Sequence, residues 1–541
     1  MTARSRRLLG VALVAVVVGV AVGVLVPRLG DAWRMKAARR HGEQMYLDWM
    51  SLLATPADPS RTYVAVAGTS GPAWNELLVA AGLPQAAFLD SAAPSALPDG
   101  YRLVVLPSSQ AGLNASVVAS VGRTVIVLEQ SERETDLALA RFATGVTLPL
   151  AGAPIRLLHL LPGERSFLTA DGGGVLGTVR AEGQGFVIRL GIDMGAHLMR
   201  LRLGLPSRAG QDRDGNGEIQ PADLLDPFPG ELFKQPWADI AIDELLSVIA
   251  MEWPGCPLPR TRGLPAGMAA VVVISADQDY ASDPFVDLMA MRLEERGVRA
   301  TFLLTDPQVG FEPDLNRDSS GRVPWLAASS ATSLVSRGFG LGIHPFPRTA
   351  RDLVEMAENF TKRYGLVPRV TRNHHVRWPD FDGMSRSAAT VGAMLDLNLM
   401  PMSVAGRPAV GFPAGSARPV RMTDASGALL PLLQQPTSVD DYSLRIENAE
   451  ARSRAVRALR TLALATLSQV RRVQAPLVVN AHPMLHAFAP DWLDPLLGAE
   501  AVHGISADRW LEFIVNRRKS RLALPRCNQP TVQLEIDVEL Q

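Results

Sequence analysis

The chain has 541 residues, which is too long for one hydrophobic core and predicts two or three domains. Hydrophobic residues make up 47% of it and charged residues 20%, an ordinary globular composition. The 54 basic and 54 acidic side chains give a net charge of zero, so no overall field favours nucleic acid as a partner. The function therefore has to be located in local motifs.

A long uncharged apolar run lies near the N-terminus. Residues 8–26 follow three arginines and, as a helix, would span about 28 Å, close to the thickness of a bilayer core. No small-x-small pattern for signal cleavage follows the run. We predict a membrane anchor over residues 1–30. We expect the bulk of the chain to lie outside the cytoplasm, in the periplasm or at the cell surface.

Residues 31–60 are predicted to form a helical stalk that carries an aromatic patch. Two cysteines, Cys256 and Cys527, lie in proline-rich stretches on either side of the second half of the chain. A disulfide that joins the two ends of one domain is compatible with these positions, and so are two unrelated buried thiols.

The first half of the chain alternates short apolar runs with helical patterns. Runs such as "TYVAVAG", "YRLVVLPSS" and "GRTVIVLEQS" are typical of buried parallel strands in α/β proteins. We predict a flavodoxin-like α/β domain over residues 61–255. The pattern resembles the class I glutamine amidotransferase-like or ThuA-like fold, which implies a cysteine nucleophile in the amidotransferases. No cysteine precedes Cys256, so we expect a catalytically silent binding or scaffold module.

The sequence "DRDGNGEIQPAD", residues 212–223, has the spacing of an EF-hand calcium loop. Ca²⁺ takes six to eight oxygen ligands around a tight turn, and the loop offers oxygen side chains at the matching intervals. The candidate ligands are Asp212, Asp214, Asn216, Glu218 and Asp223. The last position is Asp where Glu is usual, and no strongly amphipathic helix precedes the loop. A solvated turn of Asx and Gly residues is the alternative.

The second half repeats the α/β alternation more sharply. Six or seven β/α units follow one another over residues 265–520, which predicts a barrel of the TIM type or a near relative. Residues 521–541 are predicted to add a C-terminal strand segment.

Polar side chains follow four of these predicted strands, where each strand ends. The carboxyl ends of barrel strands share one rim, at which active sites are built. A lone histidine there is more often a core residue that donates to a backbone carbonyl, but a combined set indicates a site. The residues are Asp277 and Asp279 after "VVVISA", His344 after "GFGLGI", Arg372 and His374 after "PRVT", and His482 after "PLVVNA".

These segments resemble the polysaccharide deacetylase family, carbohydrate esterase family four, over about residues 267–520. "SADQD" stands at the first family motif, "GFGLGIHPFPR" at the second, "TRNHHVRW" at the arginine motif and "VVNAHPM" at the final histidine motif. The resemblance implies a distorted (β/α)7 barrel that removes N- or O-acetyl groups from sugars with a divalent metal, usually zinc.

Two family ligands are replaced. Gln278 stands where the metal-binding aspartate is expected, with Asp279 one residue later, and Arg348 stands at the second ligand histidine. A permanently charged guanidinium cannot bind a cation, and hydrolytic zinc needs three protein ligands. His374 or His375 would restore the third. Neighbours on a strand point to opposite sides, and from the register with Arg372 we predict His374.

We therefore expect a metal-dependent deacetylase that acts on a cell-envelope or exported polysaccharide. The resemblance implies that Asp277 is the general base, that His482 protonates the leaving amine and that Arg372 orients Asp277. It also implies that Asp279, His344 and His374 hold the metal. The replaced ligands support an alternative, a catalytically inactive polysaccharide-binding or assembly module. Hydrolysis of an amide or ester that is not a sugar is a third possibility.

Overall fold

A computed structural model gives the conformation of most of the chain. It describes residues 30–55, 62–89, 101–107, 115, 119, 122–129, 138–150, 152–225, 232–252, 258–305, 326–403 and 406–520. The apolar run at 8–26, both cysteines and the predicted strand segment at 521–541 lie outside these residues. Among the helices described, none is long and apolar enough to cross a membrane.

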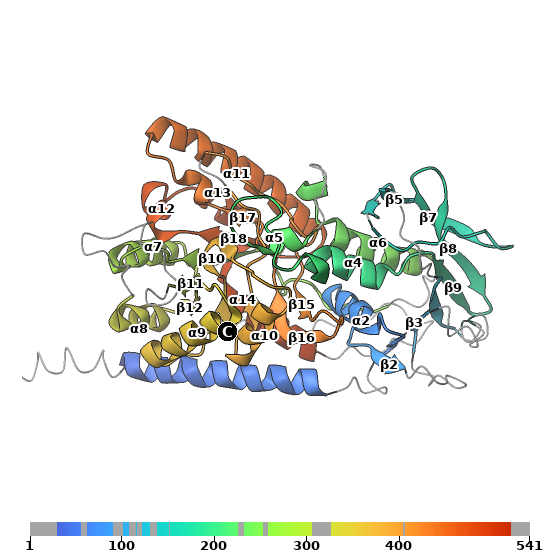
Figure 1. Ribbon diagram of the computed structural model, residues 1–541, viewed down its shortest axis with the longest axis horizontal. Helices are drawn as coiled ribbons and strands as arrows, with labels where there is room; N and C mark the ends of the chain where they lie inside the picture. Colours follow the sequence, from blue (N-terminus) through green and yellow to red (C-terminus); the bar gives the residue numbers. More distant parts are fainter. Residues whose placement is uncertain are drawn as a thin grey trace, which may run out of the picture.

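Residues 30–54, predicted as part of a stalk, form one helix, the long blue helix at the bottom of Figure 1. The helix packs against the rest of the molecule. Trp49 is 0% exposed, and its indole N–H donates to the carbonyl of Pro431 at 2.9 Å. Burial of a side chain as large as tryptophan fixes the helix firmly in place.

The first unit, residues 62–252, is built on one mixed sheet. Its strand order is β2-β1-β3-β4-β9-β8-β7-β5-β6. The strands are β1 (Val64–Ala67), β2 (Ala87–Leu89), β3 (Leu103–Pro107), β4 (Thr124–Leu128), β5 (Leu139–Phe142), β6 (Thr147–Pro149), β7 (Arg165–Ala170), β8 (Val175–Glu182) and β9 (Gly185–Leu190). The helices are α2 (Gly71–Ala80), α4 (Met194–Leu203), α5 (Pro221–Leu224) and α6 (Trp237–Glu252), with short 3-10 turns η2 (Pro206–Arg208) and η3 (Leu232–Lys234).

Half of this sheet matches the predicted α/β pattern. Strands β2, β1, β3, β4 and β9 pair in parallel. The antiparallel strands β8, β7, β5 and β6 extend the sheet and were not expected. Strands β5 and β6 are only four and three residues long, and β7 and β8 mix polar residues with apolar ones, so these strands lack the continuous apolar runs by which the parallel strands are recognised.

The second unit, residues 258–520, contains a larger curled sheet with the order β15-β16-β14-β13-β12-β11-β10-β18-β17, and β19 also pairs with β10. The strands are β10 (Ala270–Asp277), β11 (Thr301–Leu304), β12 (Gly340–Ile343), β13 (Val370–Thr371), β14 (Leu395–Asp396), β15 (Val420–Thr423), β16 (Leu429–Gln434), β17 (Val439–Asp440), β18 (Leu477–Ala481) and β19 (Val502–Ser506). All of them run parallel except β15.

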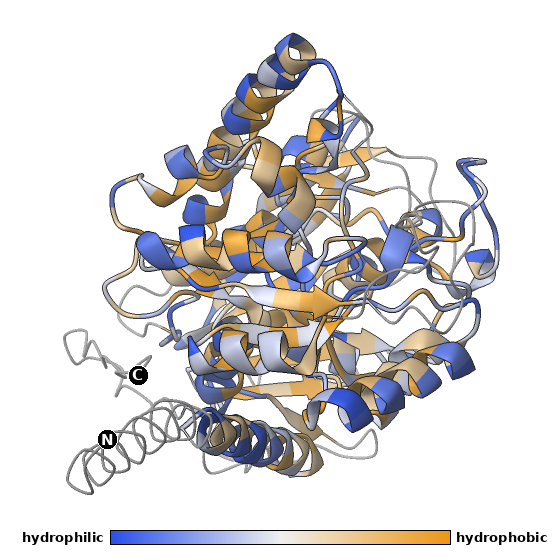
Figure 2. Ribbon diagram, turned by 90° about the vertical axis from the view of Figure 1, so that its left-hand side faces the viewer, coloured by the Kyte–Doolittle hydropathy of each residue, from blue (hydrophilic) through white to orange (hydrophobic). Residues whose placement is uncertain are grey.

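Helices surround this sheet in Figure 2, in which the central strand is apolar and the helices also carry hydrophilic faces. They are α7 (Asp283–Glu295), α8 (Ala328–Ser336), α9 (Ala350–Tyr364), α10 (Gly383–Thr390), α11 (Ala449–Arg472), α12 (Pro483–Phe488), α13 (Asp494–Leu497) and α14 (Ala507–Lys519), with turns η4 (His374–Val376) and η5 (Tyr442–Leu444). The apolar residues of these helices face the sheet and leave the opposite face hydrophilic. In α9, for example, Leu353, Met356 and Phe360 recur at helical spacing and are buried.

One segment joins the two ends of the curled sheet. The chain passes from β16 to β17, and on the way the amide of Gln435 donates to the carbonyl of Asp396 in β14. Three residues later, the amide of Ser438 donates to Val478 in β18. The sheet therefore curls on itself, and the carboxyl ends of its parallel strands meet at one rim, as the predicted barrel requires.

The two units share an interface with buried charges. The carboxylate of Glu76, in α2, is 0% exposed and lies 3.1 Å from Arg518 in α14. Asp239, in α6, accepts from the amides of Ala417 and Arg418. A single hydrophobic cluster runs through this interface, from Trp74 and Leu77 in α2 to residues of α10, β15 and β16. The two predicted domains thus have separate sheets and a common core.

Candidate metal centre

The structure places the predicted side chains together at the carboxyl rim of the second sheet. Asp277 ends β10, while His344 and His482 directly follow β12 and β18. The strands that carry them are linked by parallel pairing through β11, so their ends converge. They line a cavity of roughly 280 Å³, and Glu218 and Gln220 of the first unit also line it.

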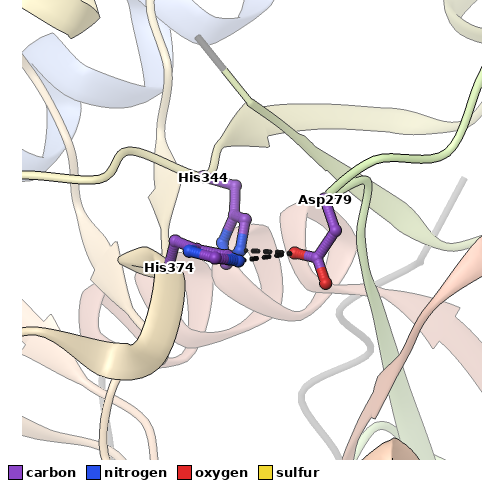
Figure 3. A group of neighbouring side chains, drawn as sticks. All are labelled: Asp279, His344 and His374. Carbon is purple, nitrogen blue, oxygen red and sulfur yellow. Dashed lines mark ion pairs between the residues drawn. The ribbon is translucent and has the colours of Figure 1, made fainter. Parts of the chain in front are cut away.

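Three potential metal ligands converge in this cavity (Figure 3). The Oδ1 atom of Asp279 lies 3.0 Å from His344 Nε2 and 3.6 Å from His374 Nε2. Ligand atoms of a tetrahedral zinc ion lie about 3.4 Å apart, because each is about 2.1 Å from the ion. Two imidazoles and one carboxylate at this spacing fit a zinc-type ion, and their role as ligands stays a prediction.

Backbone contacts orient the two imidazoles. His344 Nδ1 lies 2.8 Å from the carbonyl of Arg372, and donation to that carbonyl leaves the lone pair of Nε2 directed at Asp279. The amide of His374 donates to the carbonyl of Pro345 at 2.6 Å. The two rings meet edge to face at 5.2 Å.

The pKa shifts of Asp279 and His374 agree with a ligand cluster, whereas burial lowers the pKa of His344 but Asp277 and Asp279 outweigh it and raise that pKa above its ordinary value. Burial raises the pKa of Asp279, but His482, His344 and His374 outweigh it and hold the pKa far below its ordinary value. Burial lowers the pKa of His374 well below its ordinary value, and Asp279 only partly opposes this. A neutral imidazole beside an ionised carboxylate is the protonation state that metal binding needs.

The two replaced family positions lie apart from this cluster of ligands. The amide side chain of Gln278 is buried, accepts from the amide of Thr305 and donates to the carbonyl of Ala281. Arg348 is exposed, at the start of α9. The structure brings His374 to Asp279 in place of Arg348, while His375 Nδ1 lies 3.5 Å from Glu218 instead.

Arg372 lies beneath the cluster and is 1% exposed. Its Nη1 atom lies 2.9 Å from Asp277 Oδ1 and 2.6 Å from Asn480 Oδ1. Its Nη2 atom donates to Ser275 Oγ at 2.8 Å and to Thr437 Oγ1 at 3.0 Å. These four contacts hold the guanidinium in a single orientation. The fixed guanidinium in turn holds the Asp277 carboxylate in place.

His482 lies on the other side of the cavity. Its Nε2 atom is 3.4 Å from Asp279 Oδ2, and its Nδ1 atom is 2.5 Å from Asp441 Oδ1. Burial lowers the pKa of His482, but Asp279, Asp441 and Asp440 outweigh it and raise the pKa well above its ordinary value. The ring is thereby prepared to hold a proton.

Sequence reasoning missed Asp441 and Asn480. Asp441 directly follows β17, a strand of only two residues that gives no apolar run by which it can be recognised. Asn480 lies inside the apolar run of β18, and its Nδ2 atom donates to Asp440 at 3.2 Å. The one available signal was the acidic pair in "SVDDYS", at the point where a strand ends.

The predicted calcium loop forms a compact turn before α5. Asp212, Asp214 and Asp223 lie close enough together to hold one ion. Backbone amides already donate to all three carboxylates: Asp212 accepts from Gly215 and Gly217, Asp214 from Asn216, and Asp223 from Arg213 and Gln220. The Asn216 side chain donates to Asp214, while that of Glu218 is directed at Arg377. Calcium binding stays a prediction.

Several solved structures are similar to this chain at low sequence identity. No protein-family model matches the sequence, and no curated protein matches it. A Mycobacterium smegmatis chain described as a polysaccharide deacetylase has 15% identity over 50% of this chain and 97% of its own, with a TM-score of 0.33. Agd3, described as a novel carbohydrate deacetylase, has 8% identity over 84% of this chain and 87% of its own, also with a TM-score of 0.33. A mutant of BA3943, described as a CE4 family pseudoenzyme, has 12% identity over 47% of this chain and 70% of its own, with a TM-score of 0.26.

Proposed function

We propose that the protein is a metal-dependent hydrolase that removes acetyl groups from a cell-envelope or exported polysaccharide. The observation that carries this proposal is the convergence of Asp279, His344 and His374 beside two further groups, the Asp277–Arg372 pair and the His482–Asp441 pair. Ligands, a base and an acid within one cavity are the parts that acetyl hydrolysis requires.

Each residue has a separate task in this reaction. Asp279, His344 and His374 would hold a divalent cation, which when bound would supply Lewis acidity toward the acetyl carbonyl. Asp277 takes the proton of the attacking water, and Arg372 keeps its carboxylate in place. His482 gives a proton to the leaving amine or alkoxide, and Asp441 holds the ring so that Nε2 faces the cavity.

The donor set supports a transition metal over calcium or magnesium. Imidazole nitrogen is a good ligand for zinc, whereas calcium and magnesium prefer oxygen. The cavity of roughly 280 Å³ lies near the lower end of the usual range for small-molecule sites, roughly 300–1,000 Å³, and can take one acetylated sugar residue. Tyr280 and Tyr442 line the cavity and would give a sugar aromatic side chains to contact.

The location and the first unit belong to the same proposal. An anchor over residues 1–30 would hold the hydrolase at the membrane, outside the cytoplasm, where an exported polysaccharide passes. The first unit would act as a catalytically silent module, since its sequence has no cysteine to serve as an amidotransferase nucleophile.

The test combines metal content with product release. Purified protein is expected to contain one transition metal ion per chain by elemental analysis and to release acetate from acetylated glucosamine oligomers. His344→Ala should lose both, whereas His503→Ala, at an exposed position on β19, should lose neither. Purified protein without metal and without acetate release would refute the proposal.

A second function is favoured by the two replaced positions. Gln278 and Arg348 occupy places where the resembled family has metal ligands, so a barrel that binds polysaccharide without hydrolysing it is the competing function. In that case calorimetry would detect binding of acetylated oligomers to the wild-type chain, and the oligomers would keep their acetyl groups.

A further inference from the structure

The turn that carries His374 has a strained backbone. In the short turn η4, His375 has φ 54° and Val376 has φ 47°. A positive φ is unfavourable for any residue with a Cβ atom, and most of all for a β-branched one such as valine. A turn of this kind persists only where the surroundings hold it in place.

The first unit supplies those surroundings. Gln220 Nε2 donates to the carbonyl of His375 at 2.9 Å, and the carbonyl of Ile219 accepts from the amide of Trp378 at 2.7 Å. The first contact holds the backbone of the strained His375, and the second holds the backbone of Trp378, two residues after the strained Val376. They join segments that are more than 150 residues apart in the sequence.

Glu218 holds the same turn through its side chain. Its carboxylate forms an ion pair with Arg377 and lies 3.5 Å from His375 Nδ1. The guanidinium of Arg377 lies 3.9 Å from the ring centre of Phe346, and this ring lies 5.0 Å from that of His374. A continuous series of contacts therefore runs from Glu218 to the imidazole of His374.

The loop that makes these contacts is itself well held. Gln220 is 3% exposed, and its backbone N–H donates to Asp223 Oδ2 in the capping box of α5. Its Oε1 atom accepts from the side chain of Asn216. Because both the backbone and the side chain of Gln220 are held by the loop, the side chain cannot follow the His375 turn if that turn relaxes. It therefore keeps the turn in place.

We propose that Glu218 and Gln220 are positioning residues for the metal centre: they hold the strained turn so that His374 faces Asp279. The inference deepens the proposed function and rests on it, since it concerns the same site. It follows that metal affinity in the second unit depends on a loop of the first unit.

The experiment measures cobalt binding by the full chain. Co²⁺ gives visible absorption bands whose intensity reports ligand number, and competition with a chelator gives the affinity. Gln220→Glu keeps the size of the side chain but removes the donor to His375, and Glu218→Gln keeps the shape but removes the charge that pairs with Arg377. Each is expected to weaken cobalt binding about 10- to 100-fold, as is usual for residues that orient a ligand. Gln211→Glu is the matched control, because Gln211 is exposed in the same segment and its side chain donates to the carbonyl of Ser207, away from the turn η4.

A double variant separates positioning from general weakening of the fold. Once His374 is replaced by alanine, no ligand is left for Gln220 to position, so Gln220→Glu should cause no further loss of cobalt affinity in that background. Equal affinity of Gln220→Glu and the wild type would overturn the inference, and so would a full additional loss beside His374→Ala. A wild-type chain that binds no cobalt would overturn the proposed metal centre itself, and the two failures are thus distinct.

Discussion

The guanidinium of Arg372 lies 2.9 Å from the carboxylate of Asp277, at a depth where neither residue is more than 2% exposed. The carbonyl of the same arginine accepts from His344 Nδ1 at 2.8 Å. One residue thus positions both the proposed base and a proposed ligand. A base and a ligand that share one support cannot move independently, which favours a constant distance between them.

Replacement of Arg372 by lysine tests this arrangement. A lysine ammonium keeps the charge but cannot reproduce the forked contacts with Asp277, Asn480, Ser275 and Thr437. We expect the free energy of unfolding to fall by about 2–4 kcal/mol and acetate release to fall at least about tenfold. Urea denaturation and an acetate assay measure the two. Arg351→Lys on the exposed face of α9 should leave both within error, and a stable, fully active Arg372→Lys chain would contradict the expectation.

Asp277→Asn separates the base from the ligands. The amide keeps the shape of the carboxylate but cannot accept the proton of water, so acetate release should fall about 10²- to 10⁴-fold. Metal content should stay at the wild-type level, because Asp279, His344 and His374 are unchanged. Elemental analysis and the acetate assay on the same sample check both statements. Full activity in this variant would assign the proton transfer to another group.

The buried carboxylate of Glu76 stabilises the interface between the two units through its ion pair with Arg518. Burial raises its pKa, but Arg518 and Arg421 outweigh burial and lower the pKa below its ordinary value. This pair therefore stabilises the fold above the carboxyl pKa of the unfolded chain and loses that contribution as the pH falls through the lower, folded value. Glu76→Ala leaves Arg518 buried without its partner and should cost about 3–5 kcal/mol at pH 7.

Urea denaturation measures that cost. Glu355→Ala, on the exposed face of α9, serves as the control and should change stability by less than about 0.5 kcal/mol. Similar unfolding midpoints for the two alanine variants would contradict a role for Glu76 in stabilising the interface between the two units.

Asp396, at the end of β14, gives the opposite pH dependence. Burial raises its pKa from 3.8 to about 7, against the lowering effect of Asn398 and Arg372. The folded chain then holds a proton that the unfolded chain releases, so this group makes stability fall as the pH rises from about 4 to about 7. The slope for one group is at most about 1.4 kcal/mol per pH unit.

Asp396→Asn removes this titration. Subtracting the wild-type free energy of unfolding from that of the variant should give a difference that grows in favour of the variant between pH 4 and pH 7. Any lost hydrogen bond to Asn398 adds an offset that does not depend on pH, so the slope is the quantity to measure. Parallel stability curves for the two proteins would show that Asp396 does not titrate in this range.

The rim of the second sheet could be predicted because its signals are local. The apolar runs of β10, β12 and β18 end directly before Asp277 or a histidine, and parallel strands bring such ends together. The choice of His374 over His375 was made on the alternation of a strand. The structure gives that segment a different conformation, the turn η4, although it does bring His374 to Asp279.

Other features had no local signal. Asp441 follows a strand of two residues, and the antiparallel strands of the first sheet are either very short, as β5 and β6 are, or mix polar with apolar residues, as β7 and β8 do. The contact between Gln220 and His375 depends on how two distant segments meet, which no pattern within either segment encodes. The calcium loop was recognised by its spacing, yet spacing alone did not show that backbone amides satisfy Asp212 and Asp223.

The hydrophobic cluster shared by the two units bears on how this chain folds. Trp74 and Leu77 of the first unit lie in the same cluster as Met384, Val420 and Leu432 of the second. Neither sheet can separate from the other without exposing this apolar surface to water, so the two should melt in a single cooperative transition. A fragment that starts at the second sheet would carry an uncovered apolar face and would be prone to aggregate, even with every residue of the candidate metal centre present.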